Sequence, residues 1–148
     1  MSISYKEYLK EHGTLTYTNV GVSMLPLLRQ SKDLLIVTRK EAGRCRVGDV
    51  VLYTRTDNKY VLHRVIEVCA NDYIIMGDNC MTKEYGICDD DIIGVMTGFV
   101  RNSRQHSTSE VGYRIYTFII LHTISLRVFL KRFKNLAKRF VKKIICKK

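Results

Sequence analysis

Short runs of β-branched and apolar residues, separated by turn residues, are the feature of this sequence that most constrains its fold. Alternation and β-branching in windows this short predict strands, here at residues 14–20, 34–38, 50–54, 60–68, 72–76 and 92–100. A short helix is expected only at residues 3–11, where His12-Gly13 would end it. The residues between the third and fourth runs, Thr56-Asp57-Asn58-Lys59, have the chemistry of a hairpin turn. The first hundred residues therefore predict a compact, mostly β domain.

Charge divides the chain into unequal parts. Residues 1–110 hold 14 Lys/Arg and 14 Asp/Glu, whereas residues 111–148 hold 11 Lys/Arg and no acidic residue. The whole net charge of +11 therefore belongs to the last quarter of the chain. Residues 101–110 are polar, with three serines and a threonine. We expect a domain at residues 1–100, a polar linker at 101–110 and a tail at 111–148.

The tail has the pattern of a basic amphipathic helix. Lysines and arginines lie between apolar residues that recur at spacings of three and four, namely Leu126, Phe129, Phe133, Leu136, Phe140 and Ile144. Such helices lie in the interface of anionic membranes, which is the partner we expect. The alternatives are a helix packed on the β-domain and a nucleic-acid contact. The apolar stretch at 115–126 has 12 residues, fewer than the roughly 20 that a membrane span needs.

The cysteines and the N-terminus bear on the compartment. Five cysteines, Cys45, Cys69, Cys80, Cys88 and Cys146, form no C-x-x-C pair. They predict neither a disulfide framework nor a metal site, we expect no cofactor, and their odd number favours a reducing compartment. Residues 1–8 carry charges where a signal peptide needs an apolar run. We therefore expect a peripheral protein on the cytoplasmic face of a membrane, with an integral membrane protein as the alternative.

A constrained turn surrounds Ser23. Pro26, the only proline, follows Ser23 by three residues in Gly21-Val22-Ser23-Met24-Leu25-Pro26. Proline fixes its own φ and restricts the residue before it, and glycine permits close backbone approach. Such fixation suits a nucleophile, because a small misplacement of the attacking atom loses much of the rate. A surface turn with an incidental serine is the alternative.

His63 is the candidate general base among four histidines. The other three lie in polar segments or in the tail, whereas His63 lies in the middle of the strand expected at 60–68. Period-two alternation places it on one face with Val61 and Val65. A neutral imidazole on a rigid strand can accept a serine proton near neutral pH. The alternative is a core histidine bonded to a backbone carbonyl.

A carboxylate that orients the imidazole has three candidate positions. The first is Asp78 in Gly77-Asp78-Asn79, the second is Glu84, and the third is the cluster Asp89-Asp90-Asp91. A carboxylate in this role holds the ring in the correct tautomer and stabilises the imidazolium. Gly-Asp-Asn is also ordinary turn chemistry, and the cluster also suits a solvated loop.

Taken together, five segments in order resemble the S24/S26 peptidases, the type I signal peptidases and self-cleaving repressors. Ser23 lies in a box similar to the family's Gly-x-Ser-Met-x-Pro. The segments are Gly21-Val22-Ser23-Met24-Leu25-Pro26, Lys32-Asp33-Leu34-Leu35-Ile36-Val37, Gly48-Asp49-Val50-Val51-Leu52-Tyr53, Val61-Leu62-His63-Arg64-Val65-Ile66 and Ile75-Met76-Gly77-Asp78-Asn79. The fold that this resemblance implies is the family's coiled, mostly antiparallel β-domain.

The resemblance also selects a branch of the family. Histidine followed by arginine, as in His63-Arg64, resembles the endoplasmic-reticulum and archaeal type, whereas bacterial leader peptidases and repressors have lysine there. It implies Ser23 as nucleophile, His63 as general base and a carboxylate in or just after the Gly-Asp-Asn box. Asp78 matches that box, and Lys83-Glu84 stands where the family usually has two aspartates.

These features predict a signal-peptidase-like serine endopeptidase that acts through an acyl-enzyme. The Ser23 N–H is the expected oxyanion donor, and the substrate would bind in extended form along a sheet edge. One alternative is an inactive membrane-surface binding protein with the same fold. The other is a repressor-related regulator, which the lack of a helix-turn-helix ahead of the β-domain disfavours.

Overall fold

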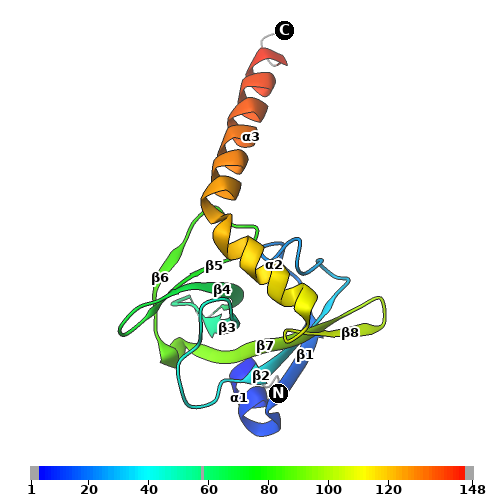
Figure 1. Cartoon of the computed structure of the whole chain (residues 1–148), viewed down its shortest axis with the longest axis vertical. Helices are drawn as coiled ribbons and strands as arrows, with labels where there is room; N and C mark the ends of the chain where they lie inside the picture. Colours follow the sequence, from blue (N-terminus) through cyan, green and yellow to red (C-terminus); the bar gives the residue numbers. More distant parts are fainter. Residues whose placement is uncertain (1–3, 58, 146–148) are drawn as a thin grey trace.

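The computed structural model describes residues 4–57 and 59–145. Residues 1–3, Asn58 and residues 146–148 lie outside this description, and so do the side chains of residues 143–145. Over the described residues, eight strands form one antiparallel sheet, and two helices follow it in the chain (Figure 1). The strands are β1 (Thr14–Thr18), β2 (Leu34–Arg39), β3 (Val50–Thr54), β4 (Tyr60–Val68), β5 (Tyr73–Met76), β6 (Glu84–Ile87), β7 (Ile92–Arg101) and β8 (Arg104–Ser107).

The mostly β domain expected from the sequence is confirmed, with two strands more than the periodicity predicted. The strands lie in the order β1-β2-β7-β3-β4-β5-β6, and β8 pairs with β7. The unpredicted strands are β6 and β8. Within the segment expected as a polar linker, at 101–110, residues 104–107 hydrogen-bond to β7 and extend the sheet.

The short helix begins and ends at residues with a physical reason to be there. Helix α1 (Tyr5–His12) starts after Ser4, whose side chain accepts from the Glu7 N–H while the Glu7 carboxylate accepts from Ser4. It ends at Gly13, whose φ of 75° is left-handed. Leu9 is buried on the inner face of α1 and joins the core.

The sheet coils so that its central strands are covered on both faces. Its registers shift within the β2–β7, β3–β7, β4–β5 and β5–β6 pairs, and such bulges bend and twist a sheet. Val50 and Leu52 of β3 enter one apolar cluster, whereas Val51 and Tyr53 enter the other. All four side chains are at most 1% exposed. β3 is therefore a rigid base for the neighbouring strand β4.

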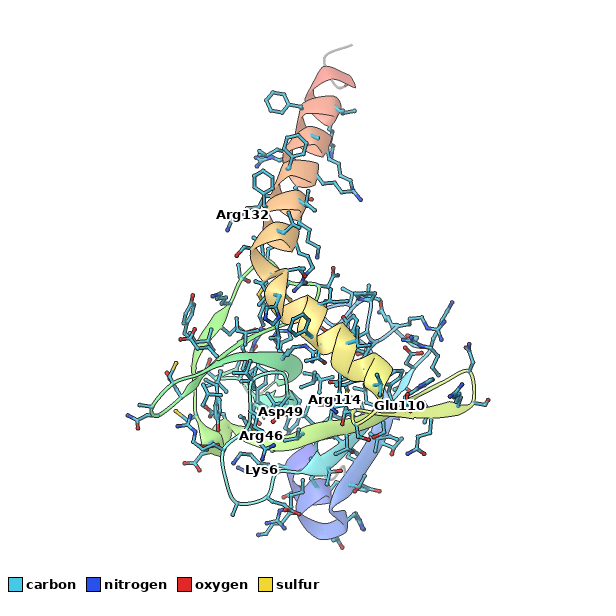
Figure 2. The ribbon with its side chains drawn as sticks, viewed as in Figure 1. Lys6, Arg46, Asp49, Glu110, Arg114 and Arg132 are labelled. Carbon is cyan, nitrogen blue, oxygen red and sulfur yellow. The ribbon has the colours of Figure 1, made fainter. Side chains whose placement is uncertain are left out.

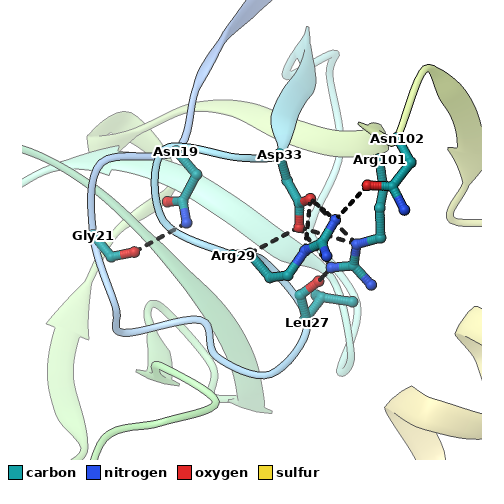
Figure 3. Close-up of polar contacts among 7 residues, drawn as sticks. All are labelled: Asn19, Gly21, Leu27, Arg29, Asp33, Arg101 and Asn102. Atoms are coloured by element: carbon teal, nitrogen blue, oxygen red, sulfur yellow. Dashed lines mark hydrogen bonds and ion pairs between the residues drawn. The ribbon is translucent and has the colours of Figure 1, made fainter.

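The turn that carries Ser23 is anchored in the core at both ends. Met24 and Leu28 are at most 1% exposed and belong to the first apolar cluster. At the far end, the buried Asp33 carboxylate accepts hydrogen bonds from the Arg29 backbone and from the Arg29 and Arg101 side chains (Figure 3). Burial alone would raise the pKa of Asp33, but these hydrogen bonds lower it to about 2.

The tail expected at 111–148 is helical as far as it is described. Helix α2 (Val111–His122) lies across the sheet, and α3 (Ile124–Ile145) leaves the domain and extends away from it (Figure 1). Over the described residues, no single helix has both the length and the apolar character to cross a bilayer. Only α2 and α3 together, as far as Lys142, pass that test, and they are bent by 66° relative to each other.

Helix α3 differs from the usual surface helix of a soluble protein, because basic side chains contact the domain and most of its apolar side chains are exposed. Its half-buried Arg127 and Lys131 contact the β-domain. The apolar side chains on its opposite face are between 55% and 66% exposed, namely Leu126, Phe129, Leu130 and Phe133. Figure 2 shows side chains standing out from α3 well beyond the sheet, with Arg132 near its base. This part of α3 thus exposes most of its apolar side chains, whereas α2 fits the alternative of a helix packed on the β-domain, because its Ile120 is buried and Tyr113 and Tyr116 pack on the core.

Candidate active site

The Ser23 turn lies against the Gly-Asp-Asn box that follows β5. The Asn79 N–H donates to the Ser23 carbonyl oxygen at 2.6 Å, and Asn79 Nδ2 donates to the Val22 carbonyl oxygen at 3.0 Å. Asn79 therefore clamps the carbonyl groups of the two peptide bonds on either side of the Ser23 Cα. The Ser23 N–H itself donates to no protein acceptor in the described part of the chain, so it is free for an oxyanion.

Strand β4 brings His63 to the same place. In the β3–β4 register His63 lies opposite Val51, and the neighbouring Val65 is buried in the second apolar cluster, as the alternation predicted. A Cβ placed on Gly77 would lie 2.7 Å from the Ser23 carbonyl oxygen and 2.9 Å from His63 Cδ2. Gly77 is therefore what lets the Ser23 backbone and the His63 ring lie on either side of the same small space.

The tautomer of His63 follows from the two groups beside Nδ1. Glu84 Oε1 lies 3.0 Å from Nδ1, and the Tyr53 hydroxyl oxygen lies 3.3 Å from it. The Tyr53 hydroxyl donates its proton to Glu84 Oε2 at 2.8 Å, so towards His63 it acts as an acceptor. Both neighbours of Nδ1 are acceptors, and the proton belongs on Nδ1. Nε2 then carries the free lone pair that a general base needs.

Glu84 is held as a carboxylate. Arg55 donates to both of its oxygens, through Nε at 2.9 Å to Oε2 and through a second nitrogen to Oε1. Burial would raise the pKa of Glu84, but the hydrogen bonds from Arg55 and Tyr53 and the neighbouring His63 lower it overall. Among the three carboxylate positions considered from the sequence, Glu84 is the one that contacts His63.

His63 is buried, and its surroundings favour the neutral imidazole. Its exposed fraction is 4%, and burial is the main cause that lowers its pKa below 6.5. The carboxylate of Glu84 acts in the opposite direction, and Arg55 adds to the lowering. On the other side of the ring, Nε2 lies 3.9 Å from Cys80 Sγ, and no hydrogen bond joins it to Ser23 Oγ in the described structure. Burial raises the pKa of the Cys80 thiol.

Asp78 does not support His63, which corrects the first choice made from the sequence. Its carboxylate forms a two-pronged pair with Arg64, with Nε to Oδ1 at 2.8 Å and Nη2 to Oδ2 at 2.7 Å. The two side chains are at most 1% exposed. Arg64 follows His63 on β4 and points to the opposite face, so it draws Asp78 away from the imidazole. Tyr116 of α2 also donates to Asp78, at 2.9 Å.

The acidic cluster at residues 89–91 lies elsewhere as well. Asp89 accepts from the Tyr73 hydroxyl at 2.6 Å and pairs with Lys40 at 3.0 Å and with Arg44 at 3.6 Å. These contacts join the short 3₁₀ turn Asp89–Asp91 to β5 and to the loop before β3. Asp89 therefore holds this turn in place and does not contact His63 in the described structure.

Two cavities flank the segment after the Gly-Asp-Asn box. One, of about 850 Å³, is lined by Arg55, Glu84 and Tyr85 among others. The other, of about 570 Å³, is lined by Met81, Tyr85 and the α3 residue Phe129 among others. Between them lies β6, the last strand in the sheet order. The geometry thus combines a fixed serine, an oriented neutral histidine and an open sheet edge.

Several site residues had no signal in the sequence. In the sequence, Tyr53 lies at a position typical of an apolar strand residue and Arg55 at one typical of a turn, and Cys80 is an unpaired thiol. Their roles depend on the β3–β4 register and on the loop before β6, which bring them around His63. Only the β3–β4 hairpin, by placing Tyr53 near His63, could have indicated one of them.

No protein-family model matches this chain, and no curated protein sequence matches it significantly.

Asp78 and Glu84 should differ sharply in what they do for stability. We expect Asp78→Asn to lower the free energy of unfolding by roughly 3–5 kcal/mol, because it leaves the buried Arg64 guanidinium without its partner. Glu84→Gln should cost about 1 kcal/mol, since Arg55 is 41% exposed and can turn to water. Urea denaturation of the two variants measures the difference. Equal losses would contradict the assignment of Asp78 to the structural pair.

The titration of His63 should report the carboxylate beside it. We expect an NMR pKa below 6.5 for His63 in the wild type, and a still lower value in Glu84→Gln, because the Glu84 charge favours the imidazolium. The other groups that act on the imidazole are unchanged in that variant: Arg55 and the more distant Asp78 through their charges, and Tyr53 and Cys80 through their contacts. A His63 pKa that rises in Glu84→Gln would overturn the pairing.

Proposed function

We propose that this chain is a serine endopeptidase of the S24/S26 type, similar to signal peptidases of the Ser/His branch. The observation that supports this most is that the Ser23 backbone and the His63 ring meet at Gly77, while Glu84 contacts the same ring at Nδ1. The coiled antiparallel sheet is compatible with the fold of that family. The proposed third member is Glu84, which replaces the Asp78 expected from the sequence.

The proposed reaction follows from the geometry. Ser23 Oγ attacks the scissile carbonyl carbon while His63 Nε2 takes its proton, and the Glu84 carboxylate stabilises the imidazolium that forms. The free Ser23 N–H stabilises the oxyanion. His63 then gives the proton to the leaving amine, and water hydrolyses the acyl-enzyme by the same route. Catalytic hydrogen bonds that are long in the free enzyme commonly tighten with substrate bound.

The substrate is proposed to be a polypeptide in extended form. β6 ends the strand order, so its outer edge can pair with an added strand. Glu84, the first residue of β6, contacts His63, so that edge leads directly to the catalytic groups. The cavities on either side of β6 supply room for substrate side chains.

We place this peptidase at an anionic membrane surface. Burial normally turns the apolar face of a helix towards the core, yet α3 turns its phenylalanines to the solvent and its Arg127 and Lys131 inwards. α2 likewise exposes Ile115 and Phe118, at 56% and 61%. With no acidic residue in 111–148, these faces suit the boundary between acyl chains and anionic headgroups. The cytoplasmic side remains a prediction from the odd number of cysteines.

Replacing the nucleophile should abolish processing of the substrates. We expect cells carrying Ser23→Ala to accumulate precursors whose N-termini are cleaved in cells carrying the wild type, as measured by proteome-wide N-terminal sequencing. His63→Ala should give the same set, because the base acts on the same step. Cys80→Ala is the matched control for a thiol near Nε2 and should process normally.

Two other outcomes would contradict the proposal. Unchanged N-termini in Ser23→Ala would favour a binding protein that keeps the fold without activity. Loss of processing in Cys80→Ala but not in Ser23→Ala would make the thiol the nucleophile.

Lipid binding should depend on the exposed aromatic face. We expect the double variant Phe129→Ser/Phe133→Ser to bind phosphatidylglycerol-containing vesicles at least ~10-fold more weakly, since burying a phenylalanine contributes roughly 1.5–3 kcal/mol. Val47→Ser is the control, because Val47 is 52% exposed on the β-domain. Vesicle co-sedimentation at low and high salt is the measurement. Equal binding to phosphatidylcholine vesicles, or tighter binding to DNA at matched salt, would contradict the assignment.

A further inference from the structure

We propose that Lys131, on helix α3, is a positioning residue for the nucleophile, acting through Asn79. This inference rests on the proposed function, because it assigns a role at the same site. It makes the C-terminal helix a component of the active site as well as a lipid-binding element. The two ends of this connection are 108 residues apart in the sequence (131 − 23).

The contacts form a continuous chain from α3 to Ser23. The Lys131 ammonium donates to two oxygens of Asn79, the backbone carbonyl oxygen and the side-chain Oδ1. The same Asn79 donates through its backbone N–H to Ser23 and through Nδ2 to Val22. Every polar group of Asn79 is thus engaged, the acceptors by Lys131 and the donors by the Ser23 turn.

The charge of Lys131 fixes which way the Asn79 amide points. A carboxamide has an oxygen and a nitrogen of similar size, and its orientation is decided by its partners. A cation on one side requires the oxygen there and directs Nδ2 at the Val22 carbonyl. Without the ammonium, the amide can rotate and the clamp on the Ser23 turn loosens. Asn79 is half-buried, so water competes only in part.

A second basic residue holds α3 in the position from which Lys131 reaches the box. Arg127, one turn earlier, donates to the Asp78 carbonyl oxygen and, at 2.9 Å, to the Ile120 carbonyl oxygen near the end of α2. It therefore joins the bend between the helices to the Gly-Asp-Asn box. One turn later, Asn135 Nδ2 lies 3.8 Å from Met81 Sδ. Three successive turns of α3 contact the box and the residues next to it.

The other basic side chains of α3 that the structure describes lack this connection. Lys134 is exposed, and it makes no hydrogen bond or ion pair in the described part of the chain. It carries the same charge on the same helix, three residues from Lys131. Lys134→Gln therefore controls for the loss of one positive charge, and Lys131→Arg tests whether a second cation can hold Asn79.

Hydrogen–deuterium exchange tests the positioning without any substrate. In Lys131→Gln we expect faster exchange in the peptide covering residues 21–29 and in the peptide covering 77–81, because the clamp opens locally. α2 and the central strands should exchange as in the wild type. Lys134→Gln should match the wild type throughout, and Lys131→Arg should be intermediate. Unchanged exchange at 21–29 in Lys131→Gln would overturn the proposal.

Kinetics on a peptide that spans an identified cleavage site give the second readout. A nucleophile misplaced by about 1 Å loses roughly 100-fold in rate, so Lys131→Gln should lower kcat by ~10- to 100-fold with KM little changed. Lys131→Arg should recover part of kcat, and Lys134→Gln should keep all of it. Equal kcat in the two glutamine variants would reject the positioning role. If Ser23→Ala processed substrates normally, the peptidase proposal would fail. The exchange result would still decide whether Lys131 positions the Ser23 turn through Asn79.

Discussion

The buried ion pair between Arg64 and Asp78 is the interaction on which the rest of the structure depends. Arg64 is fully buried and also donates to the Gly48 carbonyl oxygen and to Thr117 of α2. One guanidinium thus joins β4, the loop before β3, the Gly-Asp-Asn box and a helix from the tail. Because a lone buried charge costs several kcal/mol, these elements are stable only when assembled together. The box then sets the Ser23 turn through Asn79.

Around His63 the charges are balanced in a different way. A buried imidazole beside a bare carboxylate would be drawn towards its protonated form, which is useless as a base. Arg55 neutralises much of the Glu84 charge, while Glu84 keeps the geometry that orients the ring. These contacts therefore fix the orientation and the tautomer of the imidazole, while its affinity for a proton stays low. Arg55, partly open to solvent, can do this without the desolvation cost that Arg64 meets.

The sequence predicted what depends on local pattern, and it failed where distant contacts decide. β3 and β4 were bounded correctly because both are apolar, β-branched runs that end at turn residues. β6 and β8 were missed because Glu84-Tyr85-Gly86-Ile87 and Arg104-Gln105-His106-Ser107 have no such pattern, and pairing with β5 and β7 makes them strands. Ser23 and His63 could be proposed from motif and spacing. The carboxylate that contacts His63 could not be predicted, because Asp78 and Glu84 lie close together in the sequence. Which of the two it is depends on the burial of Arg64, which takes Asp78 as its partner. The amphipathic pattern of α3 was visible, but which face meets the domain was not.

The alternation of side chains along β4 couples the stability of the fold to the correct register of its strands. His63 and Arg64 are consecutive, so one side chain enters the pocket of the proposed catalytic groups and the next enters the buried pair on the opposite face. A slip of one residue in the β3–β4 register would exchange them. The guanidinium would then enter the pocket beside Arg55, and Asp78 would face an imidazole unable to satisfy two oxygens. A misregistered chain is therefore also an unstable one. The register that gives the stable fold is the same one that positions His63 as the proposed base.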